Sequence, residues 1–229
     1  SSVCFGVRFD PFDSNNMYAF FGNLGIWNSA DKGKTLRALC EGVPLEWRRC
    51  SYWLELDPRV RGLAWAAVSG THDLPRPKMW RRRSVSTYRG GVLVTTDGGE
   101  SWTPATCETE QMAITHILLD PRSPVGKRTL YACGFGRGVL KSTDNGRTWV
   151  VKATGIEFEE PFAWRLAMAA DGALYLVVAR RHEWGESRPS GIGALYRSTD
   201  SAENWERLPL PETVDGPTCL CIDPSDAAR

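Results

Sequence analysis

The sequence predicts an all-β protein built from four repeated units, each made of four short antiparallel strands. Two features of the 229 residues support this prediction: a Ser/Thr-x-Asp-x-Gly-x-x-Trp segment recurs four times, and an apolar run ending in Asp-Pro precedes most copies. Aromatic and β-branched segments alternate with breaks of Gly, Pro, Asp and Asn, and no segment has helical periodicity. Four-stranded repeats of roughly 40 to 50 residues have the size of propeller blades, so we expect a β-propeller.

The first strand of each expected unit ends at a recognisable marker. The motifs RFDP, ELDP, LLDP and CIDP end at Pro11, Pro58, Pro121 and Pro224. In the fourth unit we align AADG with this marker, at Asp171 and Gly172. A second apolar run follows each marker, then a short third strand, and a last strand follows the repeated motif. The expected units are 3–47, 50–108, 112–160 and 162–213, and the start of a fifth is expected at 217–229.

The repeated motif is expected to form the tight turn between the third and fourth strands of each unit. The aspartates are Asp31, Asp97, Asp144 and Asp200. Their carboxylates can accept hydrogen bonds from turn amides, and Gly33, Gly99 and Gly146 supply a positive φ at little cost. The tryptophans Trp102, Trp149 and Trp205 are expected to begin the last strand and bury their rings against the blade. The first copy ends in Leu36, and the last copy has Ala202 at the glycine position. A structural role therefore explains the motif better than a catalytic one.

The segments STDNGRTW and TTDGGESW resemble the Asp boxes, or BNR repeats, of a superfamily of propellers. That superfamily includes sialidases, oligoxyloglucan hydrolases, sortilin-type receptors and a photosystem assembly factor. The resemblance covers nearly the whole chain as a repeat pattern. It implies the fold but not one function, because these relatives perform different tasks.

The resemblance also implies more than four blades. The chain opens in a first strand and closes just after another, so we expect it to be part of a six- to eight-bladed propeller. The remaining blades are then an expected partner, in the same chain or another. Such blades would cover apolar surface at the ends of the row.

Strand order sorts the loops into two ends of the molecule. The Asp-box turns lie at one end, and two long insertions, Thr71–Gly90 and Ala179–Gly191, lie at the other. Long loops on a rigid scaffold often carry binding residues, and Arg beside aromatic rings suits sugars, carboxylates and protein partners. The binding candidates are Trp80, Arg81, Arg82, Arg83, Tyr88, Arg180, Arg181, His182 and Trp184. The alternative interpretation is a pair of solvated charged loops.

A glycoside hydrolase is the alternative function, and it needs two carboxyl groups that face each other across a sugar. The loops between units supply acidic residues at the same end as the insertions: Glu46, Glu110, Glu159, Glu160 and Asp215. The resemblance implies a catalytic acid on an inner strand shortly before Asp-Pro. The matching positions hold Gly6, Trp53, His116, Ala167 and Cys219. None of them is a carboxylate, and no Arg-Ile-Pro motif of sialidases is present. For His116 we expect a hydrogen-bonded core or channel role in preference to a catalytic base.

Composition excludes several classes of function. The 28 basic residues balance 27 acidic ones, so no overall field attracts nucleic acid. No apolar run reaches the length of a membrane-spanning helix. Seven cysteines include no CxxC pair, which favours buried thiols over a zinc site and leaves one Cys40–Cys50 bridge open. We expect no cofactor and no metal.

Two functions remain. The first is a recognition or assembly propeller that binds a protein or glycan through the end carrying the insertions. The second is a secreted glycoside hydrolase acting on a polysaccharide. The family resemblance favours an extracellular or periplasmic protein over a cytoplasmic one, and the sequence does not decide whether the chain is an enzyme.

Overall fold

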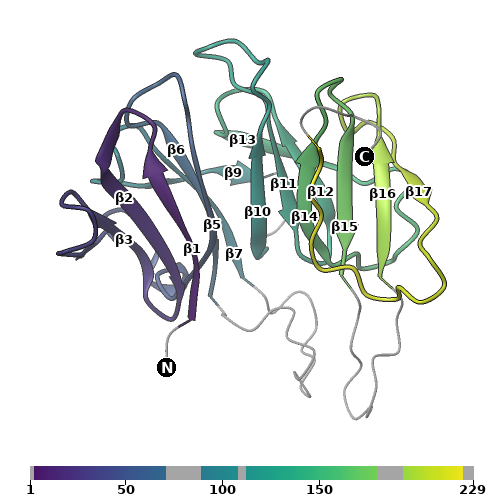
Figure 1. The fold of residues 1–229 in the computed structure, drawn as a ribbon, viewed down its shortest axis with the longest axis horizontal. Helices are drawn as coiled ribbons and strands as arrows, with labels where there is room; N and C mark the ends of the chain where they lie inside the picture. Colours follow the sequence, from purple (N-terminus) through teal and green to yellow (C-terminus); the bar gives the residue numbers. More distant parts are fainter. Residues whose placement is uncertain (1–2, 71–88, 108–111, 180–192, 224–229) are drawn as a thin grey trace.

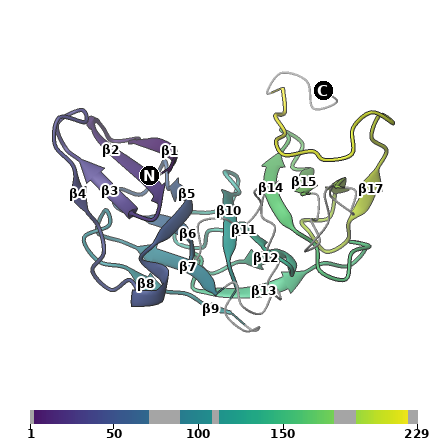
Figure 2. The same cartoon turned by 90° about the horizontal axis from the view of Figure 1, so that it is seen from below.

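The computed structural model describes residues 3–70, 89–107, 112–179 and 193–223. Within these residues the strands form sheets of eight, five and four strands, which contain four antiparallel four-stranded units, here called blades 1 to 4 (Figure 1). Blades 1 and 2 share the eight-stranded sheet through the single pair of Gly22 and Cys50. Figure 2 shows that the blades follow one another along an open arc, with β5, β10 and β14 toward its inner side. The predicted all-β propeller fold with about four blades is confirmed.

Each blade is a meander of consecutive strands, which we call A to D from the inner side outward. Blade 1 contains β1 (Val3–Asp10), β2 (Asp13–Gly22), β3 (Gly25–Ser29) and β4 (Arg37–Ala38). Blade 2 contains β5 (Cys50–Leu56), β6 (Ala64–Ser69), β7 (Gly90–Thr95) and β8 (Thr103–Pro104). Blade 3 contains β10 (Ile114–Leu119), β11 (Leu130–Gly134), β12 (Gly138–Ser142) and β13 (Thr148–Lys152). Blade 4 contains β14 (Ala163–Met168), β15 (Leu174–Val178), β16 (Ala194–Ser198) and β17 (Glu206–Leu208).

Two further elements lie in the connections between blades. A short 3-10 helix, η1 (Leu45–Trp47), precedes blade 2. The strand β9 (Thr106–Cys107) leaves blade 2 and pairs in parallel with β13 on the outer edge of blade 3. This pairing connects the end of blade 2 to the outer strand of blade 3.

The four repeated motifs form the predicted turns, which we call the aspartate turns (29–36, 95–102, 142–149 and 198–205). In the third turn, Asp144 accepts hydrogen bonds from the backbone and side chain of Thr148, at 3.0 and 2.7 Å, and from the Ser142 hydroxyl at 2.8 Å. The same bonds recur at Asp31, Asp97 and Asp200. Gly146 has φ 76°, and Ala202 adopts φ 70° at the same place in the fourth turn. All four turns therefore share one pattern of hydrogen bonds to the aspartate.

The tryptophans of the aspartate turns are buried between blades. Trp102, Trp149 and Trp205 are each at most 4% exposed, and each packs in the apolar cluster shared with the preceding blade. The backbone N–H of Trp205 donates to the carbonyl of Thr154, in the connection that leaves blade 3. Leu36, which stands at this position in blade 1, is 45% exposed. These rings therefore join successive blades, which extends the prediction that they pack on their own blade.

In blades 1 and 2, an aromatic residue of the B strand reaches the aspartate turn of the next blade. The Tyr18 hydroxyl donates to the carbonyl of Gly98 at 3.1 Å, and the Trp65 indole donates to the carbonyl of Asn145 at 2.8 Å. Tyr131 and Tyr175 occupy the same register in blades 3 and 4. These hydrogen bonds fix the position of one blade relative to the next.

The predicted position of the marker in blade 4, at Asp171 and Gly172, is wrong. The N–H groups of Asp57 and Asp120 donate to the carbonyls of Leu63 and Thr129 across the A–B turn, and the matching bond in blade 4 comes from Ala169. Ala169, and not Asp171, therefore occupies the marker position. Asp171 lies inside the turn, where its carboxylate accepts from the N–H of Ala173. The inner-strand position assigned to Ala167 belongs to Arg165.

None of the seven cysteines, all of which lie among the described residues, forms a disulfide, so the Cys40–Cys50 bridge is not formed. Cys50 and Cys133 are buried, whereas Cys4, Cys40, Cys219 and Cys221 are exposed. The interpretation of the cysteines as small buried apolar residues therefore holds for only part of the set. Among the described residues, no helix has the length and apolar character needed to span a membrane.

Candidate functional site

Each of the four inner strands carries a β-bulge at the same place. The register with the B strand shifts after Cys4, Ser51, Ile114 and Ala163. A bulge inserts one residue and re-aims the side chains that follow it. The residues just after the four bulges are Gly6, Trp53, His116 and Arg165. This repeated irregularity turns Trp53, His116 and Arg165 toward the inner side of the arc.

The extra residues of the bulges form a layer of their own. Tyr52 is 1% exposed, and its ring lies 4.8 Å from that of Phe5 and 5.8 Å from that of Trp164. In blade 3 the bulge residue is Thr115, whose hydroxyl donates to the carbonyl of Ala163 at 3.0 Å. These ring contacts and this hydrogen bond connect neighbouring inner strands, next to the residues that follow the bulges.

Beside this layer lies a cavity of about 1000 Å³ on the inner side of the arc. All four inner strands and the segment 219–222 line it. The A–B turns also contribute, through Pro11, Pro58 and Pro121. The cavity therefore extends toward the end of the blades opposite the two predicted binding loops.

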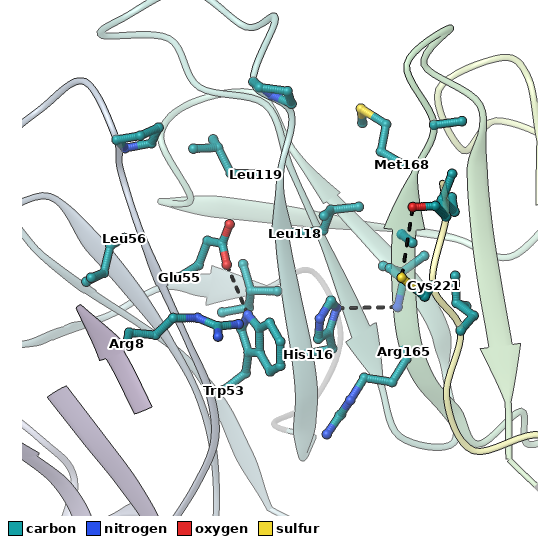
Figure 3. Close-up of a pocket in the computed structure, with 18 of the residues that line it drawn as sticks. Arg8, Trp53, Glu55, Leu56, His116, Leu118, Leu119, Arg165, Met168 and Cys221 are labelled. Carbon is teal, nitrogen blue, oxygen red and sulfur yellow. Dashed lines mark hydrogen bonds between the residues drawn. The ribbon is translucent and has the colours of Figure 1, made fainter. Parts of the chain in front are cut away.

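Trp53 lies at the centre of the charged part of the cavity (Figure 3). The guanidinium carbon of Arg8 is 4.0 Å from the centre of the Trp53 ring, and that of Arg165 is 5.5 Å away. The ring of His116 lies 4.2 Å from the Trp53 ring. Each of the four blades thus contributes one side chain to this cluster around Trp53.

Glu55 is the one carboxyl group that the described residues place in the cavity lining. It accepts a hydrogen bond from the Trp53 indole at 3.0 Å. Burial raises the pKa of Glu55 to about 7, although the hydrogen bond from Trp53 and the charge of Arg8 act in the opposite direction. A carboxyl group in this state is present in both protonation forms near neutral pH.

His116 is buried and hydrogen-bonded, as expected. Its side chain is 4% exposed, and Nδ1 accepts a hydrogen bond from the backbone N–H of Leu166 at 3.4 Å. Burial holds the pKa of His116 well below its usual value, and the nearby charges of Arg165 and Arg8 lower it further. The ring is therefore neutral at physiological pH and makes a cross-strand contact between blades 3 and 4.

Most residues selected from the sequence lie elsewhere. The candidates Trp80, Arg81, Arg82, Arg83, Tyr88, Arg180, Arg181, His182 and Trp184 fall outside the described residues, and so does Glu110. Glu46, Glu159, Glu160 and Asp215 lie in connections between blades, and none of them lines the cavity. Their proposed roles stay predictions.

Arg8, Glu55 and Arg165 were not among the site residues predicted from the sequence. Arg8 and Glu55 are visible as the first letters of the RFDP and ELDP markers, and register places them at equivalent positions of blades 1 and 2. Strand alternation counted back from those markers is the signal for this pair. Arg165 required the corrected alignment of blade 4.

Comparisons with solved structures identify the fold. The chain matches a GH74 enzyme of Niastella koreensis at 20% identity and a TM-score of 0.61, covering 89% of this chain and 30% of that one. An ancestral GH74 enzyme matches at 20% identity and 0.66, covering 90% and 25%. YCF48 from Cyanidioschyzon merolae matches at 15% identity and 0.50, covering 90% and 56%.

These similar structures are β-propellers, and at such identities the similarity shows the fold alone. The chain spans less than a third of the length of the two GH74 enzymes. No protein-family profile matches the sequence. No curated protein matches it either.

Proposed function

We propose that the chain is part of a recognition propeller, of the Asp-box type, that binds a protein or glycan without transforming it. The observation that carries this proposal is the arrangement of Arg8 and Arg165 around Trp53 in the cavity. Neither guanidinium has a carboxylate within ion-pair distance among the described residues. Unpaired arginines beside an aromatic ring are typical of binding sites.

The two long insertions complete this proposal. Thr71–Gly90 connects β6 to β7, and Ala179–Gly191 lies between β15 and β16. Both are therefore B–C connections and start from the same end of the blades. We propose that they form a second contact surface for the same partner, outside the cavity. An extracellular or periplasmic location fits this proposal, with further blades covering the ends of the row.

A glycoside hydrolase of the Asp-box type is the second candidate, and Glu55 is the observation in its favour. A carboxyl group with a pKa of about 7 in a cavity suits a general acid. The second carboxyl group that glycoside hydrolysis requires is not among the described residues that line the cavity. Because the described lining residues include a single carboxyl group, we favour the binding function over the hydrolase function.

One experiment separates the two candidates. The protein is tested against defined glycan and peptide arrays, and in parallel for release of reducing ends from β-glucans and sialosides. We expect a bound ligand without release, and weaker binding after Trp53→Ala in a variant that circular dichroism shows to be folded, since Trp53 also packs against an apolar cluster. Replacement of Trp80 and Arg81–Arg83 should also weaken binding if that loop takes part. Release of reducing ends that Glu55→Gln abolishes would refute the binding proposal.

A further inference from the structure

The cavity has a cationic part and an apolar part. Figure 3 shows the cationic Arg8 and Arg165, together with the neutral ring of His116, in its lower part, and Leu118, Leu119 and Met168 above them. The apolar part continues over Phe9 and Leu56, and Phe9 is 63% exposed. A site with these two regions matches a ligand that has a charged group attached to an apolar body.

The two arginines are held in place but not neutralised. Arg8 donates from Nε to the carbonyl of Leu54 at 3.3 Å. One terminal nitrogen of Arg165 donates to the carbonyls of Thr115 and Trp164, each at 2.9 Å. Carbonyl groups orient a guanidinium without cancelling its charge, so the other nitrogens keep donor capacity for an anion. Burial lowers the pKa of Arg165, because its charge is poorly solvated in this position.

Another arginine of the cavity shows the contrast. Arg122 also lines the cavity, but its Nε and a terminal nitrogen both donate to the Asp120 carboxylate at 3.0 Å. Its charge is already matched by an acid of the same turn. Arg122 therefore serves as an internal reference for a guanidinium that has no need of a ligand.

A neutral sugar fits this cavity poorly. Sugars stack on open aromatic faces and need many polar partners, whereas Arg8 and His116 already lie against the Trp53 ring. The upper wall offers aliphatic side chains in place of hydrogen-bonding groups. The chemistry of the lining selects an anion that carries apolar atoms next to its charge.

We propose that the cavity binds an amphipathic carboxylate, with the carboxylate at the end of the cavity that Arg8 and Arg165 form and the apolar body against Phe9, Leu56, Leu118 and Met168. This inference rests on the proposed binding function and narrows the ligand of the same site. A free aliphatic acid and the terminal carboxylate of a peptide ending in apolar residues share this chemistry. Bidentate guanidinium–carboxylate contacts provide the specificity, and the aliphatic wall provides apolar burial.

Glu55 makes the binding dependent on pH. The groups that face its carboxyl are Arg8 from β1, the Trp53 indole from β5 and the backbone of Leu119 from β10. Protonated Glu55 leaves the cationic part uncompensated, whereas ionised Glu55 competes with the ligand for Arg8. Affinity for a carboxylate is therefore expected to fall as the pH rises from 6 to 8, and Glu55→Gln should remove most of this change.

The test is calorimetric titration of the whole chain with octanoate at pH 6. We expect Arg8→Gln and Arg165→Gln each to weaken binding by about tenfold or more, because each removes charge-assisted hydrogen bonds. The matched control Arg122→Gln should change the affinity by less than about threefold. Leu118→Ser should weaken octanoate binding and leave acetate binding unchanged. Circular dichroism of each variant shows whether the fold is retained, and Arg165→Lys replaces Arg165→Gln if the latter unfolds.

Ligand controls decide the chemistry. A short leucine-rich peptide with a free C-terminus, compared with its amidated form and with octanoate, identifies which source of carboxylate binds more tightly. Tighter binding of glucuronate or inorganic phosphate than of octanoate would overturn the proposal, as would equal losses in the Arg8 and Arg122 variants. Octanoate binding without any hit on the arrays would refute macromolecular recognition and leave this inference standing. Array hits without carboxylate binding would support macromolecular recognition and refute this inference.

Discussion

Glu55 couples the protonation of one carboxyl group to the stability of the fold. Its folded pKa of about 7 lies above the ordinary value of 4.5 for a glutamate, so the folded state binds the proton more tightly than the unfolded state. The stability that this proton contributes is complete below about pH 4.5. It is lost as the pH rises through 7.

We therefore predict that Glu55→Gln removes the loss of folding stability that the wild-type protein suffers at high pH, where buried Glu55 is ionised. The free energy of unfolding of the variant, relative to wild type, should rise between pH 4.5 and 8 by up to about 3 kcal/mol. Urea denaturation at several pH values measures this difference. His116 contributes the opposite slope below pH 6.5, because its folded pKa is depressed, but it is present in both proteins and cancels in the comparison. A difference that does not change with pH would contradict the assignment.

Ala202 carries a backbone conformation that suits glycine. It has φ 70° in the fourth aspartate turn, where the other turns have Gly33, Gly99 and Gly146. Ala202→Gly should raise the free energy of unfolding by up to about 1 kcal/mol, since glycine adopts positive φ without the steric cost of a Cβ. Thermal or urea unfolding measures the change.

The reverse exchange in the third turn provides the matched control. A Cβ added at Gly146 would lie 2.5 Å from the Trp65 indole nitrogen, and the residue has φ 76°. Gly146→Ala should therefore destabilise the protein and disturb the contact between blades 2 and 3. The two exchanges should therefore change the free energy of unfolding in opposite directions. A change of the same sign in both variants would contradict the role of backbone conformation in these turns.

At the scale of the element, the aspartate turn is the repeated device of the fold. Asp144→Ala should lower the free energy of unfolding by about 1 to 3 kcal/mol, because the N–H groups of Arg147 and Thr148 lose their acceptor. Asp171→Ala is a useful comparison, since that carboxylate accepts from the single N–H of Ala173 in the described structure. A binding defect at unchanged stability would instead assign the Asp144 turn a functional role.

The sequence predicted these elements because their signals are local. A Ser-x-Asp-x-Gly turn and an apolar run ending in Asp-Pro each depend on residues a few positions apart. The marker of blade 4 was misplaced by two residues because Ala169 has no carboxylate, while Asp171 of the turn mimics one. Local signals therefore predict strands well, and they misplace register where the marker residue is replaced.

The candidate site was less predictable for a physical reason. A bulge in each inner strand decides which side chains face the cavity, and no residue type marks the bulges, which fall at Phe5, Tyr52, Thr115 and Trp164. The grouping of Arg8, Trp53 and Arg165 joins three strands that are far apart in the chain. Such a cluster follows from the packing of blades, which the sequence pattern does not encode directly.

At the scale of the whole molecule, a buried ion pair joins blades 2 and 3. Arg128 donates from two nitrogens to the Asp57 carboxylate, at 2.6 and 2.7 Å, and both side chains are 0% exposed. A further nitrogen of Arg128 donates to the carbonyl of Ser123. The sequence marked Asp57 through the ELDP motif but gave no signal for its partner, 71 residues later.

Removal of one partner leaves the other charge buried, so Arg128→Met should lower the free energy of unfolding by about 3 to 5 kcal/mol. The exposed pair of Arg37 and Glu100, which joins blades 1 and 2, is the matched control. Arg37→Met should cost less than about 1 kcal/mol. Chemical denaturation measures both values, and similar losses in the two variants would contradict the distinction between buried and exposed pairs.

The placement of β9 bears on how copies of this protein behave at high concentration. An outermost strand with unpaired backbone groups invites intermolecular sheet extension, and such strands promote aggregation when they are long. Three of the blades end in strands of only two or three residues, and the five-residue β13 is partly covered by β9. The periphery of the arc thus offers little template for fibril-like growth, even though strands dominate the chain.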